Sequence, residues 1–470
     1  MGLLRQLHFL QVLMDTRLHI KQKRIKAEQA VAVSFFLSIL LGSLLLALPV
    51  SAADGQATPY MDALFTAATA VCVTGLVTVT TAVHWSLFGK AVILILIQIG
   101  GLGIMSIMTM FFLALRRRIT LGEQKLLKES YNLLQLEGVV GLVKKIVLGT
   151  LAVEGAGAVL YACCLVPVYG PGNGVFMSVF NAVSCFCNAG MDIIGPDSLK
   201  PFVSNPLMNI TTMLLIILGG IGFIVWWDVL NFIKNRSGRR KRRNQQLGLH
   251  AKLVLIVTAL LIVGGTVLIL AFEWNNPDSI GNLPLPEKVM AAAFQSVTTR
   301  TAGFETIAQA SFTDATALLS MVLMFVGGSP LGTAGGMKTT TAALVVLLVS
   351  MFIRGDDGIV LFHRRISMNN VRTAVVVVAV GLTAAVTGTM LLSLTVEADF
   401  LDVAYEVVSA LGTVGLTRGL TPNLAWSGKL IVIVIMYMGR IGPITLMLAL
   451  VRKKRKKQQV QYPEQQIMIG

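Results

Sequence analysis

The chain has 470 residues, of which 55% are hydrophobic and only 13% are charged, and its mean hydropathy is +0.75. This composition excludes a set of soluble domains and predicts an integral membrane protein. The net charge of +16 does not indicate nucleic-acid binding, because the basic residues gather in short clusters between apolar runs. By the positive-inside rule these clusters lie in the cytoplasm, where they favour contact with anionic membrane lipids.

The first apolar run, Val31–Val50, follows a basic segment that we assign to the cytoplasm, residues 1–30. Its length matches the roughly 20 residues that cross a bilayer core. It begins too far from the N-terminus for a cleaved secretory signal, so we expect a retained span.

The rest of the chain repeats one pattern four times: a span, an outer loop, a half-length apolar helix that ends at a glycine, and a second span. About a dozen helical residues reach only about 18 Å, so the half-helices are expected to be re-entrant in a core about 30 Å thick. The expected segments are Val31–Val50, Tyr60–Leu76 and Phe88–Leu115; Ile146–Val168, Val175–Met191 and Leu207–Phe232; Leu253–Phe272, Val289–Phe304 and Ala315–Phe352; and Thr373–Thr395, Phe400–Leu416 and Leu430–Val451.

The predicted fold is therefore an all-α integral membrane protein of four covalently linked M1–P–M2 repeats, with eight transmembrane helices and four re-entrant pore helices around a pseudo-fourfold pore. Its predicted parts are 31–118 for repeat 1, 119–234 for a linker and repeat 2, 235–354 for a basic linker and repeat 3, 355–451 for a linker and repeat 4, and 452–470 for a cytoplasmic tail.

The glycines that end the half-helices, Gly75, Gly190, Gly303 and Gly415, recur at intervals of 112 to 115 residues. A single glycine would merely end a helix, but a period this regular marks an internal repeat. Glycine lets the backbone turn so that carbonyls replace the hydration shell of a cation. We therefore predict a potassium filter formed by Val73, Thr74, Gly75, Asn188, Ala189, Gly190, Thr301, Ala302, Gly303, Thr413, Val414 and Gly415.

These segments, Val-Thr-Gly-Leu, Asn-Ala-Gly, Thr-Arg-Thr-Ala-Gly-Phe and Gly-Thr-Val-Gly-Leu-Thr, resemble in that order the four filter segments of the Trk/Ktr/HKT potassium transporters. The resemblance covers residues 30–450, and the tail Tyr462–Gly470 is similar to that of KtrB-type membrane subunits. It implies a potassium-uptake subunit in a bacterial cytoplasmic (inner) membrane, with both termini in the cytoplasm. It also implies a homodimer on a cytoplasmic ring of nucleotide-binding RCK (KtrA-like) subunits.

Potassium is thus the expected cargo, sodium is a candidate coupling ion for symport, and no organic cofactor is expected on this chain.

The second span of repeat 3 carries small and polar residues in its middle. Such a sequence fits a loop across a water-filled path, while a kinked helix packed through small residues is the alternative. We favour a gating loop under the filter, as the resemblance also implies. The expected gating residues are Gly327, Gly328, Ser329, Pro330, Gly332, Thr333, Gly335, Gly336, Lys338 and, from the fourth repeat, Arg440.

Three charged residues fall inside or beside spans, where an unpaired charge is costly. Arg440 either forms an electrostatic barrier that holds the gating loop or makes a structural salt bridge, for example to Glu154. Glu154 itself suits a packing role or a proton relay equally well. Arg300 precedes the third filter segment and is expected to brace its wall, because a cation in the ion path would oppose conduction.

Other functions fit the sequence less well. A sodium-permeable HKT-like transporter is the main alternative, although in that family a serine replaces the first-repeat glycine, where this chain has Gly75. An enzyme that uses Glu154 or the pair Cys185 and Cys187 lacks a plausible acid–base, nucleophile or metal cluster. An aquaporin-like pore would need two half-helices with Asn-Pro-Ala turns. We therefore expect a transporter and not an enzyme.

Overall fold

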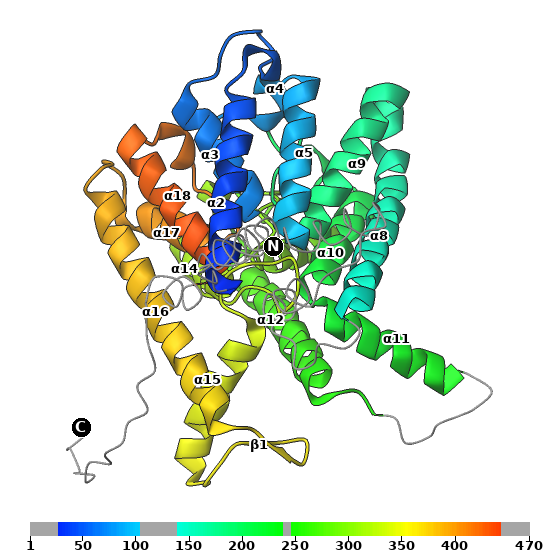
Figure 1. The fold of residues 1–470 in the computed structure, drawn as a ribbon, viewed down its shortest axis with the longest axis vertical. Helices are drawn as coiled ribbons and strands as arrows, with labels where there is room; N and C mark the ends of the chain where they lie inside the picture. Colours follow the sequence, from blue (N-terminus) through cyan, green and yellow to red (C-terminus); the bar gives the residue numbers. More distant parts are fainter. Residues whose placement is uncertain (1–26, 104–138, 238–245, 443–470) are drawn as a thin grey trace, which may run out of the picture.

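A computed structural model describes residues 27–103, 139–237 and 246–442 (Figure 1). This part of the chain is almost entirely helical, with one short hairpin of β1 (Val360–Leu361) and β2 (Arg364–Arg365). The longer helices are α2 (Ala27–Leu46), α3 (Tyr60–Cys72), α5 (Leu87–Leu102), α8 (Val139–Tyr169), α9 (Pro171–Cys187), α10 (Pro206–Gly220), α11 (Phe223–Ser237), α12 (Leu249–Glu273), α13 (Leu285–Thr298), α14 (Asp314–Phe325), α15 (Thr339–Arg354), α16 (Met368–Ser393), α17 (Phe400–Gly412) and α18 (Trp426–Ile441). Short turns α4 (Thr81–His84), η1 (Pro49–Ser51), η2 (Lys200–Phe202), η3 (Gln309–Ser311) and η4 (Thr421–Asn423) lie in the connections.

Four helices of the described residues, α2, α8, α12 and α16, are long and apolar enough to cross a membrane. The most apolar, α12, has a mean hydropathy of 2.9 in a window that is only 22% buried. A helix that exposes so much apolar surface is stable in lipid and not in water. Each of these helices begins one of the predicted repeats.

The second helix of each repeat is either interrupted or only partly covered by the described residues. α5 and α18 end where the description stops, so most of the expected extensions to Leu115 and Val451 lie outside it, as do the linker residues 119–138 and the tail 452–470. In repeat 3, α14 and α15 are separate helices joined by residues 326–338. The count of eight spans therefore stays a prediction.

The expected second span of repeat 2, Leu207–Phe232, is broken in the structure, because α10 and α11 are bent by 101° at a break that contains Gly222. Gly222 has φ +90°, and a Cβ there would lie against the Pro330 carbonyl. The amide of Phe223 donates to the carbonyl of Leu331 at 3.0 Å. The segment between α14 and α15 thus occupies the place where α10 would continue. Its Leu331 carbonyl accepts the hydrogen bond that the Phe223 amide would otherwise donate within a straight helix.

The helices contact one another in a repeating order. Each long helix packs on the short helix that follows it, in the pairs α2 and α3, α8 and α9, α12 and α13, and α16 and α17. The second helix of each repeat then packs on the short helix of the next, in the pairs α5 and α9, α10 and α13, α14 and α17, and α18 and α3. Because the last pair returns to the first repeat, these contacts close into a ring.

Small residues bring the second helices close to the ends of the short helices. A Cβ added to any of three glycines would lie against a backbone carbonyl: Val71 O for Gly100, Phe186 O for Gly219, and Leu411 O for Gly439. Lipid gives little hydrophobic drive for helices to associate, so such close packing is what holds them together. Gly100, Gly219 and Gly439 follow Gly75, Gly190 and Gly415 by 25, 29 and 24 residues, so this close contact recurs at similar offsets in three of the repeats.

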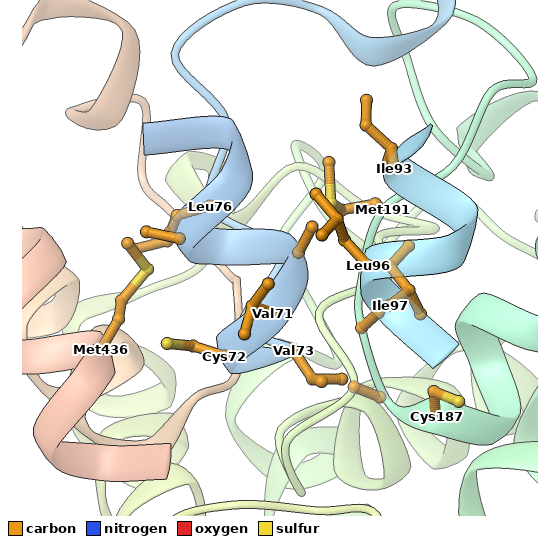
Figure 2. Packing of buried hydrophobic residues seen from close by; sticks show 14 of the residues in the cluster. Val71, Cys72, Val73, Leu76, Ile93, Leu96, Ile97, Cys187, Met191 and Met436 are labelled. Carbon is orange, nitrogen blue, oxygen red and sulfur yellow. The ribbon is translucent and has the colours of Figure 1, made fainter. Parts of the chain in front are cut away.

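Buried side chains fill the space around the first of these contacts (Figure 2). Ile93 and Ile97 of α5, Leu76 after α3, and Met436 of α18 are all fully buried. They come from the first and last repeats, so the core at this point joins the two ends of the described chain. The four short helices are similarly enclosed, and every residue of α17 from Val403 to Gly412 is buried.

Candidate ion pathway

The short helices end in the same unusual backbone conformation. After α3, α9 and α17 the chain enters the left-handed region at Val73 (φ 55°), Asn188 (φ 58°) and Thr413 (φ 52°), and after α13 it does so at Thr301 (φ 69°). This conformation is uncommon for residues other than glycine, and it costs on the order of 1 kcal/mol or more at each position. Its recurrence at four matched places indicates that a shared backbone shape is selected there.

Two residues later each segment carries a glycine with positive φ, and these four glycines lie together. Each one packs against the carbonyl that precedes the next glycine: Gly75 against Ala189, Gly190 against Ala302, Gly303 against Val414, and Gly415 against Thr74. The series closes on itself, so the glycines form a ring. Any Cβ would enter this ring and collide with a carbonyl, which explains why all four positions are glycine.

Hydroxyl side chains inside the short helices hold the segments in place. Thr69 and Ser409 accept hydrogen bonds from the amides of Gly75 and Gly415 at 2.9 and 3.1 Å. Ser184 and Thr298 instead donate to the carbonyls of Met191 and Phe304, just beyond the other two glycines, at 2.5 and 2.7 Å. Sequence reasoning missed these residues. Their signal is a serine or threonine five or six residues before each glycine, in an otherwise apolar helix.

The carbonyls of the four segments accept no hydrogen bond from the described residues. Three side-chain atoms nearby are buried and also lack a partner there: Thr74 Oγ1, Asn188 Oδ1 and Thr413 Oγ1. Buried oxygens without a donor are costly unless a cation or water meets them. This set of neutral oxygens, at the C-terminal ends of four helices, is chemically suited to a monovalent cation.

Residues 326–338 form an irregular loop beside the ring, as expected. Thr333 donates from Oγ1 to the Phe186 carbonyl at 2.9 Å and from its amide to the Gly219 carbonyl at 3.0 Å. Farther along, Gly335 packs against the Thr413 side chain and Gly336 against the Gly412 carbonyl. The loop therefore extends from the second repeat to the fourth, crossing under the ends of the short helices.

Arg440 of α18 binds this loop. Its guanidinium donates to the carbonyl of Thr333 in the loop, to that of Gly100 in α5, and to that of Gly101 at 3.4 Å. The alternative salt bridge to Glu154 is wrong, because Glu154 accepts from Gln98 Nε2 at 3.1 Å and faces Cys187. The planar, forked shape of a guanidinium lets one side chain join two backbone segments, which a lysine would do less well.

Comparison with known proteins identifies the family of this chain. A family profile described as TrkH, a cation transport protein, matches residues 9–462. The chain belongs to the TrkH family of cation transport proteins. TrkH-family members are transporters and not enzymes, and the long apolar helices agree with a multi-pass membrane protein.

Several curated relatives match nearly the whole chain. It is 39% identical over 454 residues to the potassium/sodium uptake protein NtpJ of Enterococcus hirae, covering 96% of this chain and 98% of the relative. It is 38% identical over 451 residues to the Ktr system potassium uptake protein B of Bacillus subtilis, covering 96% and 98%. The TrkH crystal structure from Vibrio parahaemolyticus shares the fold with a TM-score of 0.70 at 18% identity, covering 92% of this chain and 86% of that one. The resemblance drawn from the glycine segments is thus confirmed.

Two other buried charges of this TrkH-family chain lie behind the filter segments. Arg300 is only 6% exposed, and its guanidinium lies 3.5 Å from Thr258 Oγ1 in α12. The side chain thus points toward the surrounding helix, and the expected bracing role stays a prediction. Glu154 is 4% exposed and contacts Cys187, the last residue of α9, so it sits directly behind the second filter segment.

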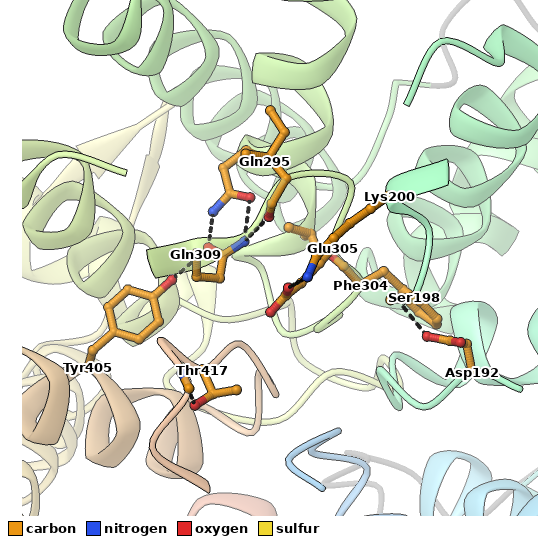
Figure 3. Close-up of polar contacts among 12 residues, drawn as sticks. Asp192, Ser198, Lys200, Gln295, Phe304, Glu305, Gln309, Tyr405 and Thr417 are labelled. Carbon is orange, nitrogen blue, oxygen red and sulfur yellow. Dashed lines mark hydrogen bonds and ion pairs between the residues drawn. The ribbon is translucent and has the colours of Figure 1, made fainter. Parts of the chain in front are cut away.

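The glycine ring forms the floor of a cavity of about 180 Å³, which the topology predicted from the basic clusters places on the outer side. Its walls carry Asp192, Asp197, Glu305 and Lys200. Figure 3 shows the Lys200 side chain reaching Glu305, and Asp192 beside Ser198. Burial raises the pKa of Glu305, which lies in the loop after α13, to about 7, although the nearby Lys200 opposes this rise. Three acids therefore line this cavity together with one lysine, which sequence reasoning did not single out.

Proposed function

We propose that the chain is the potassium-conducting membrane subunit of a bacterial Ktr-type uptake system. The observation that carries this proposal is the closed ring of Gly75, Gly190, Gly303 and Gly415, with the unpaired carbonyls that surround it. The filter would consist of the carbonyls of residues 73–75, 188–190, 301–303 and 413–415.

The chemistry of a potassium ion suits such a ring. The ion leaves its water shell without a large net cost when several carbonyl dipoles replace that shell. The short helices support it further, because their C-terminal ends carry partial negative charge. Each quarter supplies only one glycine, so we expect fewer ion sites than in a channel with a longer glycine-rich filter.

The ring of helix contacts supports the fourfold M1–P–M2 arrangement. Four long helices each begin a unit, and the second helix of each unit packs on the short helix of the next. This cyclic order is what a pseudo-fourfold pore requires. It also makes the short helices re-entrant, with their irregular ends buried in protein and facing an ion path.

In this proposal, residues 326–338 are the gate and Arg440 is its latch. The loop passes between the second and fourth repeats directly beneath the filter segments, and the guanidinium ties it to α5. A positive charge at this depth also repels cations while the latch is closed. A cytoplasmic RCK-type subunit and a second copy of the chain would complete the system, as the resemblance to Ktr proteins implies.

The name of the Enterococcus relative, a potassium/sodium uptake protein, favours a second candidate function, which is sodium transport through the same ring. The two candidates differ in selectivity and not in architecture. Gly75 at the first filter position supports potassium as the main cargo.

Growth rescue of a potassium-uptake-deficient bacterium, with and without a coexpressed RCK subunit, tests the proposal. We expect the chain to restore growth at low external potassium, and rubidium uptake to be inhibited by potassium much more strongly than by sodium. Failure to rescue despite normal abundance in the membrane, with the RCK subunit present, would contradict the potassium assignment. Equal inhibition by sodium would favour the second candidate.

A further inference from the structure

The outer cavity places a lysine where a cation must pass. Asp192, Asp197 and Glu305 line this cavity, and Lys200 is the only basic residue among the described residues that do so. The floor of the cavity is the glycine ring itself. An ammonium group beside a cation path raises the energy of an approaching cation, so a lysine at this position requires a physical explanation.

Lys200 is held in position by its backbone. The neighbouring Leu199 is 2% exposed, and its amide donates to the Glu305 carbonyl at 3.1 Å. The amide of Lys200 donates to the Asp197 carbonyl at 3.1 Å. Ser198 donates to Asp192 Oδ2 at 2.6 Å, which fixes the start of the same loop. The loop thereby fixes the start of the lysine side chain beside the third filter segment.

The lysine reaches the acid that stands over that segment. Lys200 Nζ lies 3.6 Å from Glu305 Oε2, and the two side chains are 35% and 17% exposed. The one contact of this pair is longer than a hydrogen bond, and the lysine keeps about a third of its side chain in solvent, so bracing the fold is a poor explanation for it. An ammonium group has the same charge as a potassium ion and similar size, and Glu305 accepts either of them.

We propose that Lys200 sets the affinity of the transporter for external cations, acting as a tethered competitor for Glu305 at the mouth of the filter. The proposal rests on the proposed function and deepens it. When the ammonium group of Lys200 pairs with the carboxylate of Glu305, the cavity attracts cations less. An arriving ion is then held only briefly before it moves to the glycine ring. A cation in the mouth displaces the ammonium group without breaking any backbone contact.

The proposal has a signature that a structural ion pair lacks. Removing either partner of a structural pair damages the same contact, so both changes shift transport in the same direction. Removing a competitor and removing the group for which it competes have opposite effects. Lys200 also helps to keep Glu305 charged, so the comparison is made at an external pH well above the pKa of Glu305. There Lys200→Gln leaves a charged Glu305 free to attract cations, whereas Glu305→Gln removes the carboxylate and leaves the lysine unpaired.

The test is rubidium uptake by cells that express the full-length chain, measured over a range of external rubidium concentrations. We expect Lys200→Gln to lower KM by roughly threefold or more at low ionic strength, and Glu305→Gln to raise it, because one unit charge acts through partly screened solvent. The double variant should lie between them. External barium should inhibit Lys200→Gln more strongly than the wild type, because the acids that line the cavity then attract a divalent ion without a competing ammonium group.

Lys288→Gln is the matched control. Lys288 also lies on the outer side, where it packs 5.1 Å from the Trp274 ring, and it does not line the cavity. A KM for Lys200→Gln equal to that of Lys288→Gln would overturn the proposal, as would shifts in the same direction for Lys200→Gln and Glu305→Gln. Loss of uptake by the wild type would instead defeat the proposed function.

Discussion

Replacing Arg440 by glutamine should open the gate, because it removes the latch on the loop. The guanidinium makes one hydrogen bond to the loop, at the Thr333 carbonyl, and two to α5. A hydrogen bond from a charged donor contributes about 1.5–3 kcal/mol. Loss of the bond to the loop alone would therefore shift the closed–open equilibrium about 10- to 150-fold toward the open state.

The assay is rubidium uptake in cells or proteoliposomes without an RCK subunit, a condition in which the proposed gate is expected to be closed. Arg440→Gln should raise rubidium flux by as much as the same 10- to 150-fold factor, unless another step of transport becomes rate-limiting. Arg440→Lys should give a smaller rise, because it keeps the charge but loses the fork that reaches two backbone segments.

Arg418→Gln is the control, since Arg418 pairs with Asp402 at 2.6 Å on the outer side and has no contact with the loop. Unchanged or lower flux for Arg440→Gln, at normal abundance in the membrane, would refute the latch.

Three further predictions follow from the same geometry. Deleting Leu331–Gly335 should raise flux without changing the oligomeric state, for which we propose a homodimer, as measured by uptake and size-exclusion chromatography; unchanged or lower flux at normal expression would contradict the gate. Gly415→Ser should lower the preference for potassium over sodium in competition assays, because its side chain would collide with the Thr74 carbonyl at φ +98°. Burial raises the pKa of Glu305 to about 7, so it is neutral below that pH and charged above it, and KM should fall as external pH rises through about 7. This pH dependence should disappear in Glu305→Gln.

The four glycine segments that close into the ring were predictable from the sequence, because they depend on local chemistry and on period. A glycine at the end of an apolar helix is visible in each repeat, and the spacing of 112 to 115 residues ties the four together. The interruption between α14 and α15 was predictable for a similar reason, since a run of glycines, serines and threonines does not sustain a helix in lipid.

The features that were missed depend on contacts between distant repeats. The glycines within Leu207–Phe232 indicate a bend or close packing, but they do not reveal that the loop from the third repeat occupies the place next to Gly222. The partner of Arg440 is a set of backbone carbonyls, which carry no signature in the sequence. The lysine of the outer mouth looked like an ordinary loop residue until the structure brought Lys200 next to Glu305.

The central claim is that the four glycine segments bind the transported ion, and anomalous diffraction from crystals grown in a thallium salt tests it most directly. Thallium mimics potassium and scatters strongly enough to be located. We predict anomalous peaks on the axis of the ring, surrounded by the carbonyls of residues 73–75, 188–190, 301–303 and 413–415. An empty ring at saturating thallium, with peaks only at the outer acids, would contradict the filter assignment.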